Sequence, residues 1–262
     1  MVITFASVWI GAVLAAGLGV IDPVRVTLGA LAAGFIAAAG NVHNDICDID
    51  IDRINRPERP LARGDADSSI AGMFAYFLAG TGIGIGILLG TAPLLIVITA
   101  VVLLYLYNSH LKMTVLWGNL AVSLLTALAF IFGAVLADNV AMGVVPAVFS
   151  LFFHFSREVI KDIEDLKGDA IRRGSTFAMK YGSDSAAGLA AGSLLTLMLL
   201  IPLPYLANLY EIEYILVCLF GVELPVAVVV YRLLRKKPDY RQMSGLLKFG
   251  MVMGLIALLV GH

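Results

Sequence analysis

The chain has 262 residues, of which 60% are hydrophobic and 14% charged, and its formal net charge is −1. Soluble domains carry about 25% charged residues, so this composition excludes a soluble protein and indicates one embedded in a membrane. The basic residues are not gathered on one soluble surface, which leaves nucleic-acid binding without support. Cys47 and Cys218 have no metal-ligand spacing, and we expect free, buried thiols.

Apolar runs long enough to cross a bilayer, or nearly so, follow one another along the chain. They lack the alternation of a membrane β-barrel, so each is expected to be a helix. The first run lacks the pattern of a signal peptide and is expected to be a retained span. The nine predicted spans are residues 3–21, 25–44, 70–90, 94–111, 115–137, 141–160, 184–203, 211–235 and 243–261. We therefore expect an all-α, polytopic membrane protein of nine transmembrane helices, with residues 1–262 forming a single domain.

The second predicted span runs directly into an acidic motif at residues 41–60, NVHNDICDIDIDRINRPERP. At 100° per residue on a helix, five polar residues share one face within an arc of about 100°. These residues are Asn41, Asn44, Asp45, Asp48 and Asp52. Like charges one turn apart repel, so this face requires a cation, and a divalent metal is the natural one. Asp50 points the opposite way and is expected to be solvated.

A second acidic motif, REVIKDIEDLKGDAIRR at residues 157–173, follows the sixth predicted span. Its acidic face has the same helical phase and consists of Glu158, Asp162, Asp165 and Asp169. Glu164 lies off this face and is expected to be solvated. Two carboxylate rows at the mouth of a helical bundle could hold Mg²⁺, which typically binds a few carboxylates together with substrate phosphates. Neighbouring Arg and Lys side chains would contact diphosphate oxygens.

The basic residues are distributed unequally between the two sides of the membrane. Both acidic motifs end even-numbered spans and share one side with nearly all Lys and Arg residues, whereas the loops of the other side contain only Arg25. The positive-inside rule assigns the basic side to the cytoplasm. We expect a cell-membrane protein with a cytoplasmic N-terminus, an external C-terminus and a site that opens to the cytoplasm.

The two motifs carry a resemblance to a known family. Asn44-Asp45-x2-Asp48-x3-Asp52 followed by NRPERP, and Asp162-x2-Asp165-x3-Asp169, resemble the two aspartate-rich motifs of the UbiA superfamily of intramembrane prenyltransferases. Within it, REVIKDIEDLKGD together with NRPERP is most similar to the archaeal digeranylgeranylglyceryl phosphate synthases. The resemblance implies nine helices around a lipid-accessible central cavity. Relatives usually begin with an amphipathic stretch that carries an Arg-Pro pair, whereas this chain opens with MVITF.

The resemblance also implies roles for individual residues. The implied Mg²⁺ ligands are Asn44, Asp48 and Asp52 for one ion, and Asp162 and Asp169 for the other. The implied catalytic residues are Asp45, Asp48, Asp162 and Asp165, of which Asp45 and Asp165 support the metal ligands. The implied diphosphate-binding residues are Arg56, Arg59, Lys112 and Lys161.

The resulting hypothesis is Mg²⁺-dependent transfer of a geranylgeranyl group from its diphosphate to the hydroxyl of geranylgeranylglyceryl phosphate, which makes an ether-lipid precursor. A phosphate acceptor requires a further basic group, for which Arg63, Lys161 and Lys180 are candidates. An aromatic acceptor of quinone synthesis, 4-hydroxybenzoate or a naphthoate, is the close alternative. A cation-coupled transporter is the alternative of another class, and its carboxylates would lie near the midplane. The expected partners are the isoprenyl diphosphate, the acceptor and membrane lipid, with no nucleic acid.

Overall fold

The computed structural model describes residues 2–17, 21–166, 176–235 and 239–261, and this part of the chain contains helices and no strand. The expected all-α fold is therefore confirmed. The helices form two compact units. The first comprises the described residues within 1–113 and 128–143, and the second comprises those within 114–127, 144–167 and 174–262.

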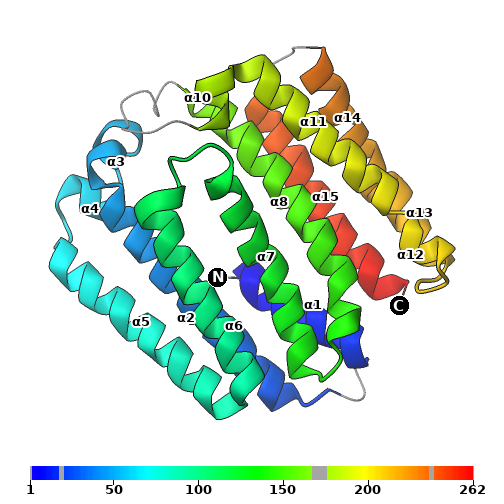
Figure 1. Ribbon diagram of the computed structural model, residues 1–262, viewed down its shortest axis with the longest axis horizontal. Coiled ribbons are helices and arrows are strands. Elements are labelled where there is room, and N and C mark those ends of the chain that lie inside the picture. Colours follow the sequence, from blue (N-terminus) through cyan, green and yellow to red (C-terminus); the bar gives the residue numbers. More distant parts are fainter. Residues whose placement is uncertain (1, 18–20, 167–175, 236–238, 262) are drawn as a thin grey trace. The chain divides into compact units, whose positions relative to one another are not determined.

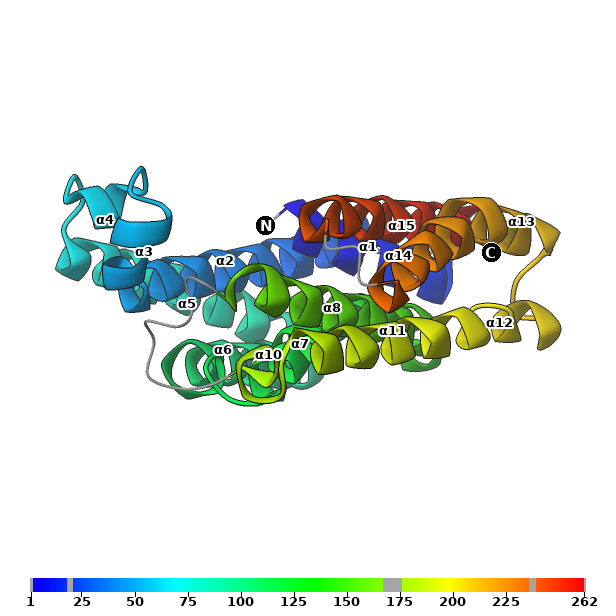
Figure 2. The same cartoon turned by 90° about the horizontal axis from the view of Figure 1, so that it is seen from above.

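In the first unit, α2 lies side by side with α5 and also contacts α1 and α6 (Figure 1). The short helices α3 and α4 lie at the C-terminal end of α2 (Figure 2). The elements of this unit are α1 (Val2–Ala16), α2 (Pro23–Cys47), α3 (Ile49–Asn55), α4 (Pro60–Arg63), α5 (Ser68–Leu89), α6 (Thr91–Leu106), the π-helix η1 (Tyr107–Leu111) and the 3-10 helix η2 (Val140–Gly143).

In the second unit, α8 packs against both α11 and α15 (Figure 1). Helix α7 (Trp117–Leu136) contributes its first half to this unit and its second half to the first unit. The other elements are α8 (Val144–Glu164), α10 (Phe177–Tyr181), α11 (Ser183–Leu200), α12 (Leu203–Leu206), α13 (Ile212–Cys218), the π-helix η3 (Leu219–Glu223), α14 (Leu224–Leu234) and α15 (Tyr240–Val260).

Eight helical segments of the described chain are long and apolar enough to cross a membrane. They correspond to the second to ninth predicted spans. The first prediction, residues 3–21, became α1, which has only 15 residues and is followed by Gly17 at a φ of +75°. At 1.5 Å per residue α1 is about 23 Å long, shorter than the roughly 30 Å of a bilayer's hydrocarbon core. The described residues therefore give eight long spans and one short apolar helix.

Local capping explains where α2 and α5 begin. The Asp22 carboxylate accepts hydrogen bonds from the backbone N–H groups of Val24 and Arg25 at 2.9 and 3.1 Å, and Pro23 occupies the first helical position. Asp67 accepts in the same way from the first turn of α5. These bonds satisfy N–H groups that have no partner inside the helix. The bonds to Asp67 also lower the pKa of its exposed carboxyl below its usual value.

Helices α1 and α7 approach each other closely within the first unit. A Cβ at Gly133 would lie 2.0 Å from the Val8 carbonyl oxygen, and a Cβ at Gly11 would lie 2.4 Å from the Phe130 carbonyl oxygen. Only glycine permits this backbone contact, which is the usual role of small residues where membrane helices meet. The contact adjoins an apolar core that includes the buried side chain of Phe132.

Candidate active site

The first acidic motif is divided between two helices. Helix α2 ends at Cys47 and α3 begins at Ile49, and Asp48 between them has φ −102° and ψ 5°. The Asp48 N–H still bonds to the Asn44 carbonyl at 3.0 Å, and the Asp52 N–H bonds to the Asp48 carbonyl at 2.8 Å. The backbone departs from α-helical dihedral angles at this one residue but keeps the helical hydrogen bonds on both sides of it, so the motif remains nearly continuous helix.

The polar residues of the motif contact two different cations, and the first group, Asn44 and Asp48, surrounds Lys112. The Lys112 Nζ donates to the Asn44 Oδ1 at 2.8 Å and to the Asp48 carboxylate. The Asn44 Nδ2 also donates to Asp48, at 3.1 Å. Asp48 is only 7% exposed, so its charge needs a nearby compensating charge. Lys112 provides it from 64 residues further along the chain.

The π-helix η1 positions Lys112. Its buried residue Asn108 donates through Nδ2 to the Gly40 carbonyl at 3.0 Å and lies 3.3 Å from the His43 Nδ1. These contacts hold η1 against α2, and the Lys112 N–H then bonds to the Tyr107 carbonyl at 2.9 Å. Single π-turns frequently occur at functional sites. The sequence analysis missed Asn108, although an amide at the end of an apolar run is a signal that could have identified it.

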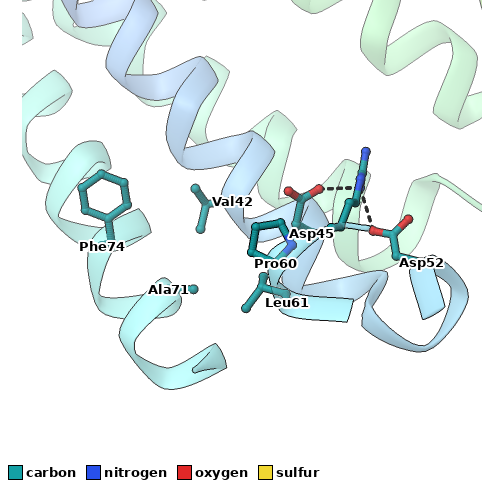
Figure 3. A pocket seen from close by; sticks show the side chains of 8 residues that line it. Val42, Asp45, Asp52, Pro60, Leu61, Ala71 and Phe74 are labelled. Carbon is teal, nitrogen blue, oxygen red and sulfur yellow. Dashed lines mark hydrogen bonds and ion pairs between the residues drawn. The ribbon is translucent and has the colours of Figure 1, made fainter. Parts of the chain in front are cut away.

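The second group consists of Asp45 and Asp52, which are labelled in Figure 3, and surrounds Arg59. The Arg59 Nη1 donates to the Asp45 Oδ1 at 2.6 Å and to the Asp52 Oδ2 at 2.7 Å. Burial by itself would lower the pKa of Arg59, but the hydrogen bond to Asp52 and the charges of Asp45 and Asp48 outweigh it and raise that pKa above its usual value. Arg59 therefore remains a cation, held against two carboxylates of the motif.

A pocket of about 190 Å³ adjoins Arg59 (Figure 3). Its lining combines these charged groups with apolar side chains from α2, α4 and α5. The lining residues are Val42, Asp45, Asp52, Arg59, Pro60, Leu61, Ala71 and Phe74. Such a pocket suits a ligand in which a charged group is joined to an apolar segment.

Two further residues of the first motif lie at its surface. Asp50 is 90% exposed and pairs with Arg53 at 2.9 Å, which confirms that it is solvated. Arg56, a predicted diphosphate ligand, is exposed at the C-terminal end of α3, where its N–H bonds to the Asp52 carbonyl at 2.8 Å. The structure therefore places Arg56 beside the second group without joining it to that group.

The second motif lies at the end of α8. The Asp162 Oδ2 accepts a hydrogen bond from the Asn119 Nδ2 of α7 at 2.8 Å, and Asn119 is a further residue that the sequence analysis missed. Asp165 and Glu164 are exposed, which confirms that Glu164 is solvated. The Lys161 Nζ lies 3.5 Å from Glu158. Asp169, a predicted metal ligand, lies outside the described residues.

The oxygen ligands predicted to hold metal are arranged around side-chain cations. Within the described ranges, no three His, Cys, Asp or Glu side chains converge into a preformed metal site. Instead, Lys112 contacts Asn44 and Asp48, and Arg59 contacts Asp45 and Asp52. Amide and carboxylate oxygens are the ligands that Mg²⁺ prefers, so the donor chemistry of the first motif fits that ion.

The sequence and the fold of this chain are similar to those of known prenyltransferases. A model of the UbiA prenyltransferase family matches residues 4–255. Digeranylgeranylglyceryl phosphate synthase from Methanothermobacter thermautotrophicus is 33% identical over 225 residues, which cover 85% of this chain and 80% of the relative. A solved structure of a digeranylgeranylglyceryl phosphate synthase has a TM-score of 0.81 at 30% identity and covers 98% of this chain and 92% of its own. A UbiA homologue from Archaeoglobus fulgidus bound to GPP and Mg²⁺ shares the fold, with a TM-score of 0.68 at 14% identity over 98% of this chain and 96% of its own.

Proposed function

This chain belongs to the UbiA prenyltransferase family and is a membrane-embedded prenyltransferase, and on that premise we propose that it transfers a geranylgeranyl group from its diphosphate to the free hydroxyl of geranylgeranylglyceryl phosphate. The relative from Methanothermobacter thermautotrophicus, whose name describes the product of this reaction, matches 85% of the chain. The structural observation that carries the proposal is the Arg59 group, in which a cation and two carboxylates adjoin an apolar pocket.

The proposed metal sites use the oxygen ligands of the two motifs. Asn44, Asp48 and Asp52 hold one Mg²⁺, supported by Asp45. The other ion is held by Asp162 and Asp169, supported by Asp165. Bound Mg²⁺ neutralises negative charge on a phosphoryl oxygen. The ligand chemistry of this chain supports the metal assignment. Asp48 and Asp52 are buried carboxylates on adjoining helical turns, and carboxylate oxygens are suitable Mg²⁺ ligands.

The cationic side chains stabilise the leaving group. When the bond between C1 of the prenyl chain and the diphosphate oxygen breaks, its electron pair stays with the diphosphate, where negative charge develops. Cations held in place before the reaction lower the barrier because they need no reorganisation. We assign this role to Arg59 and Lys112, which the carboxylates already orient, with Arg56 and Lys161 as further contacts.

The acceptor then forms the new bond. Its hydroxyl oxygen attacks C1, and its proton passes to a carboxylate of the motifs or to the released diphosphate. The products are a diether lipid phosphate and diphosphate. The apolar lining beside Arg59, which includes Leu61 and Phe74, favours the prenyl chain over water.

We also propose the predicted topology, with a cytoplasmic N-terminus, an external C-terminus and a site that opens to the cytoplasmic side of the cell membrane. The salt bridge between Arg25 and Asp138, at 2.8 Å, supports it. This bridge joins Arg25, the first residue of the second predicted span, to the loop that follows the fifth, as expected if both positions lie on one side. The family match from residue 4 to residue 255 supports one domain over the whole chain.

The proposal is tested with purified membranes, labelled geranylgeranyl diphosphate, Mg²⁺ and three acceptors: geranylgeranylglyceryl phosphate, 4-hydroxybenzoate and a naphthoate. We expect labelled product from the glyceryl phosphate lipid alone. Product from an aromatic acid and none from the lipid would overturn the proposed acceptor. Asp48→Asn and Asp162→Asn should each reduce turnover by at least about 100-fold in folded protein, and full activity of either variant would contradict the metal assignment.

A further inference from the structure

Three charged side chains in the last turns of α8 form a group of their own. Glu158 is only 8% exposed. Its carboxylate accepts a hydrogen bond from the Arg157 Nη1 at 2.9 Å and lies 3.5 Å from the Lys161 Nζ. A carboxylate this deeply buried needs compensating charge, so Glu158 holds both cations in place. The group as a whole retains one positive charge.

Arg157 has a donor that this group does not use. Its Nε–H is buried, and no acceptor for it exists among the residues that the structure describes. The Glu158 carboxylate accepts a hydrogen bond from Nη1 alone. The other edge of the guanidinium, formed by Nε and Nη2, does not bond to this carboxylate. A buried N–H without an acceptor costs about as much free energy as a lost hydrogen bond, and native structures rarely contain one. This edge therefore points to a ligand with acceptor oxygens.

The chemistry of the edge indicates which ligand. Two parallel N–H groups of a guanidinium match two oxygens of a phosphate, and the positive charge of the group favours an anion. We propose that Arg157 binds a phosphate group and thereby recognises the phosphate of the acceptor lipid. This inference rests on the proposed function, whose acceptor carries a phosphate monoester.

The other candidates for this role have weaker support. Arg63 has a side chain that is 62% exposed and is paired with Asp65. Lys180 lies over the ring of Tyr181, with its Nζ 5.2 Å from the ring centroid. Arg157 differs from both. A buried carboxylate fixes the orientation of its guanidinium, and its buried Nε–H has no acceptor among the described residues. The donor's diphosphate offers the same oxygens, so the experiment must separate the two substrates.

The experiment compares two acceptors at saturating geranylgeranyl diphosphate: geranylgeranylglyceryl phosphate and its dephosphorylated alcohol, geranylgeranylglycerol. For Arg157→Ala we expect kcat/KM for the phosphorylated acceptor to fall by roughly 10- to 100-fold, the range of one charge-assisted hydrogen bond. The kcat/KM for the alcohol and the KM for the donor should stay within about twofold. Arg157→Lys keeps the charge but loses the two-pronged edge, so its loss should be intermediate.

The matched control is Arg235→Ala, which removes an exposed arginine of the same unit that lies over the Tyr231 ring and should change none of these values. Equal losses with both acceptors, together with a raised KM for the donor, would mean that the edge binds the diphosphate and would overturn the acceptor assignment. Unchanged kinetics in both Arg157 variants would overturn the phosphate site altogether. If Arg157→Ala does not fold, the same comparison in Arg157→Lys decides. Failure of the proposed function is seen separately, in wild-type protein that makes no product from the phosphorylated acceptor.

Discussion

The bridge from Arg59 to Asp45 and Asp52 permits a quantitative test of how the first motif is held together. Arg59→Gln preserves the approximate size of the side chain and removes its charge. Asp52, whose side chain is only 9% exposed, would then be left beside Asp45 without the cation that both now share. Arg53→Gln is the matched control because Arg53 pairs with Asp50 at 2.9 Å in the same segment, but both side chains are largely exposed.

The expected magnitude follows from burial. Exposed ion pairs contribute about 0–1 kcal/mol, and breaking a fully buried pair costs about 3–5 kcal/mol. The side chains of Arg59 and Asp45 are 26% and 40% exposed, so we expect an intermediate loss of about 2 kcal/mol in the free energy of unfolding. For a chain of this size that corresponds to a fall in Tm of about 4–8 °C. Arg53 and Asp50 form an exposed pair three residues apart on α3, which contributes about 0.2–0.5 kcal/mol, so Arg53→Gln should lower Tm by less than about 2 °C.

The assay is thermal unfolding in detergent with EDTA and at increasing Mg²⁺ concentration. Because the carboxylates in Arg59→Gln lack their cation, Mg²⁺ should raise the Tm of this variant more than that of wild type. The reasoning is refuted if Arg59→Gln and Arg53→Gln lose the same stability in EDTA. It is equally refuted if Mg²⁺ raises the Tm of Arg59→Gln no more than that of wild type.

Three further changes test the site and the packing. Asn119→Asp replaces a donor 2.8 Å from Asp162 with a second carboxylate. Repulsion between two neighbouring carboxylates favours a bound cation, so the Mg²⁺ concentration needed for half-maximal activity should fall several-fold, and an unchanged Mg²⁺ titration would contradict this role. Gly133→Ala places a methyl group 2.0 Å from a backbone oxygen of α1, so Tm should fall by several degrees. An unchanged Tm would mean that α1 and α7 can move apart at no cost in stability. Asp50→Asn alters a carboxylate that is 90% exposed, so turnover should stay within about twofold of wild type. A large loss would show that Asp50 takes part in metal binding after all.

Composition and residue spacing alone predicted much of this protein. Long apolar runs must form helices in a bilayer because backbone polar groups have no water to bind there, so the eight long spans follow from the sequence. The solvated positions of Asp50 and Glu164 also followed from helical phase. Both predictions depend on local geometry, which repeats at 3.6 residues per turn.

The pairing of charges required the tertiary structure. Helical phase placed the polar residues of the first motif on one face, but it did not show that Asn44 and Asp48 contact Lys112. Nor did it show that Asp45 and Asp52 contact Arg59. No periodicity links Asp48 to a lysine 64 residues away, because that contact depends on η1 and on the amide of Asn108.

The same reason applies to the second motif, where Asn119 of α7 donates to Asp162 of α8, 43 residues further along the chain. A sequence shows which side chains carry charge and on which face of a helix they lie. Which opposite charge or amide meets each of them is decided when separate helices pack, since burial makes an unpartnered charge costly.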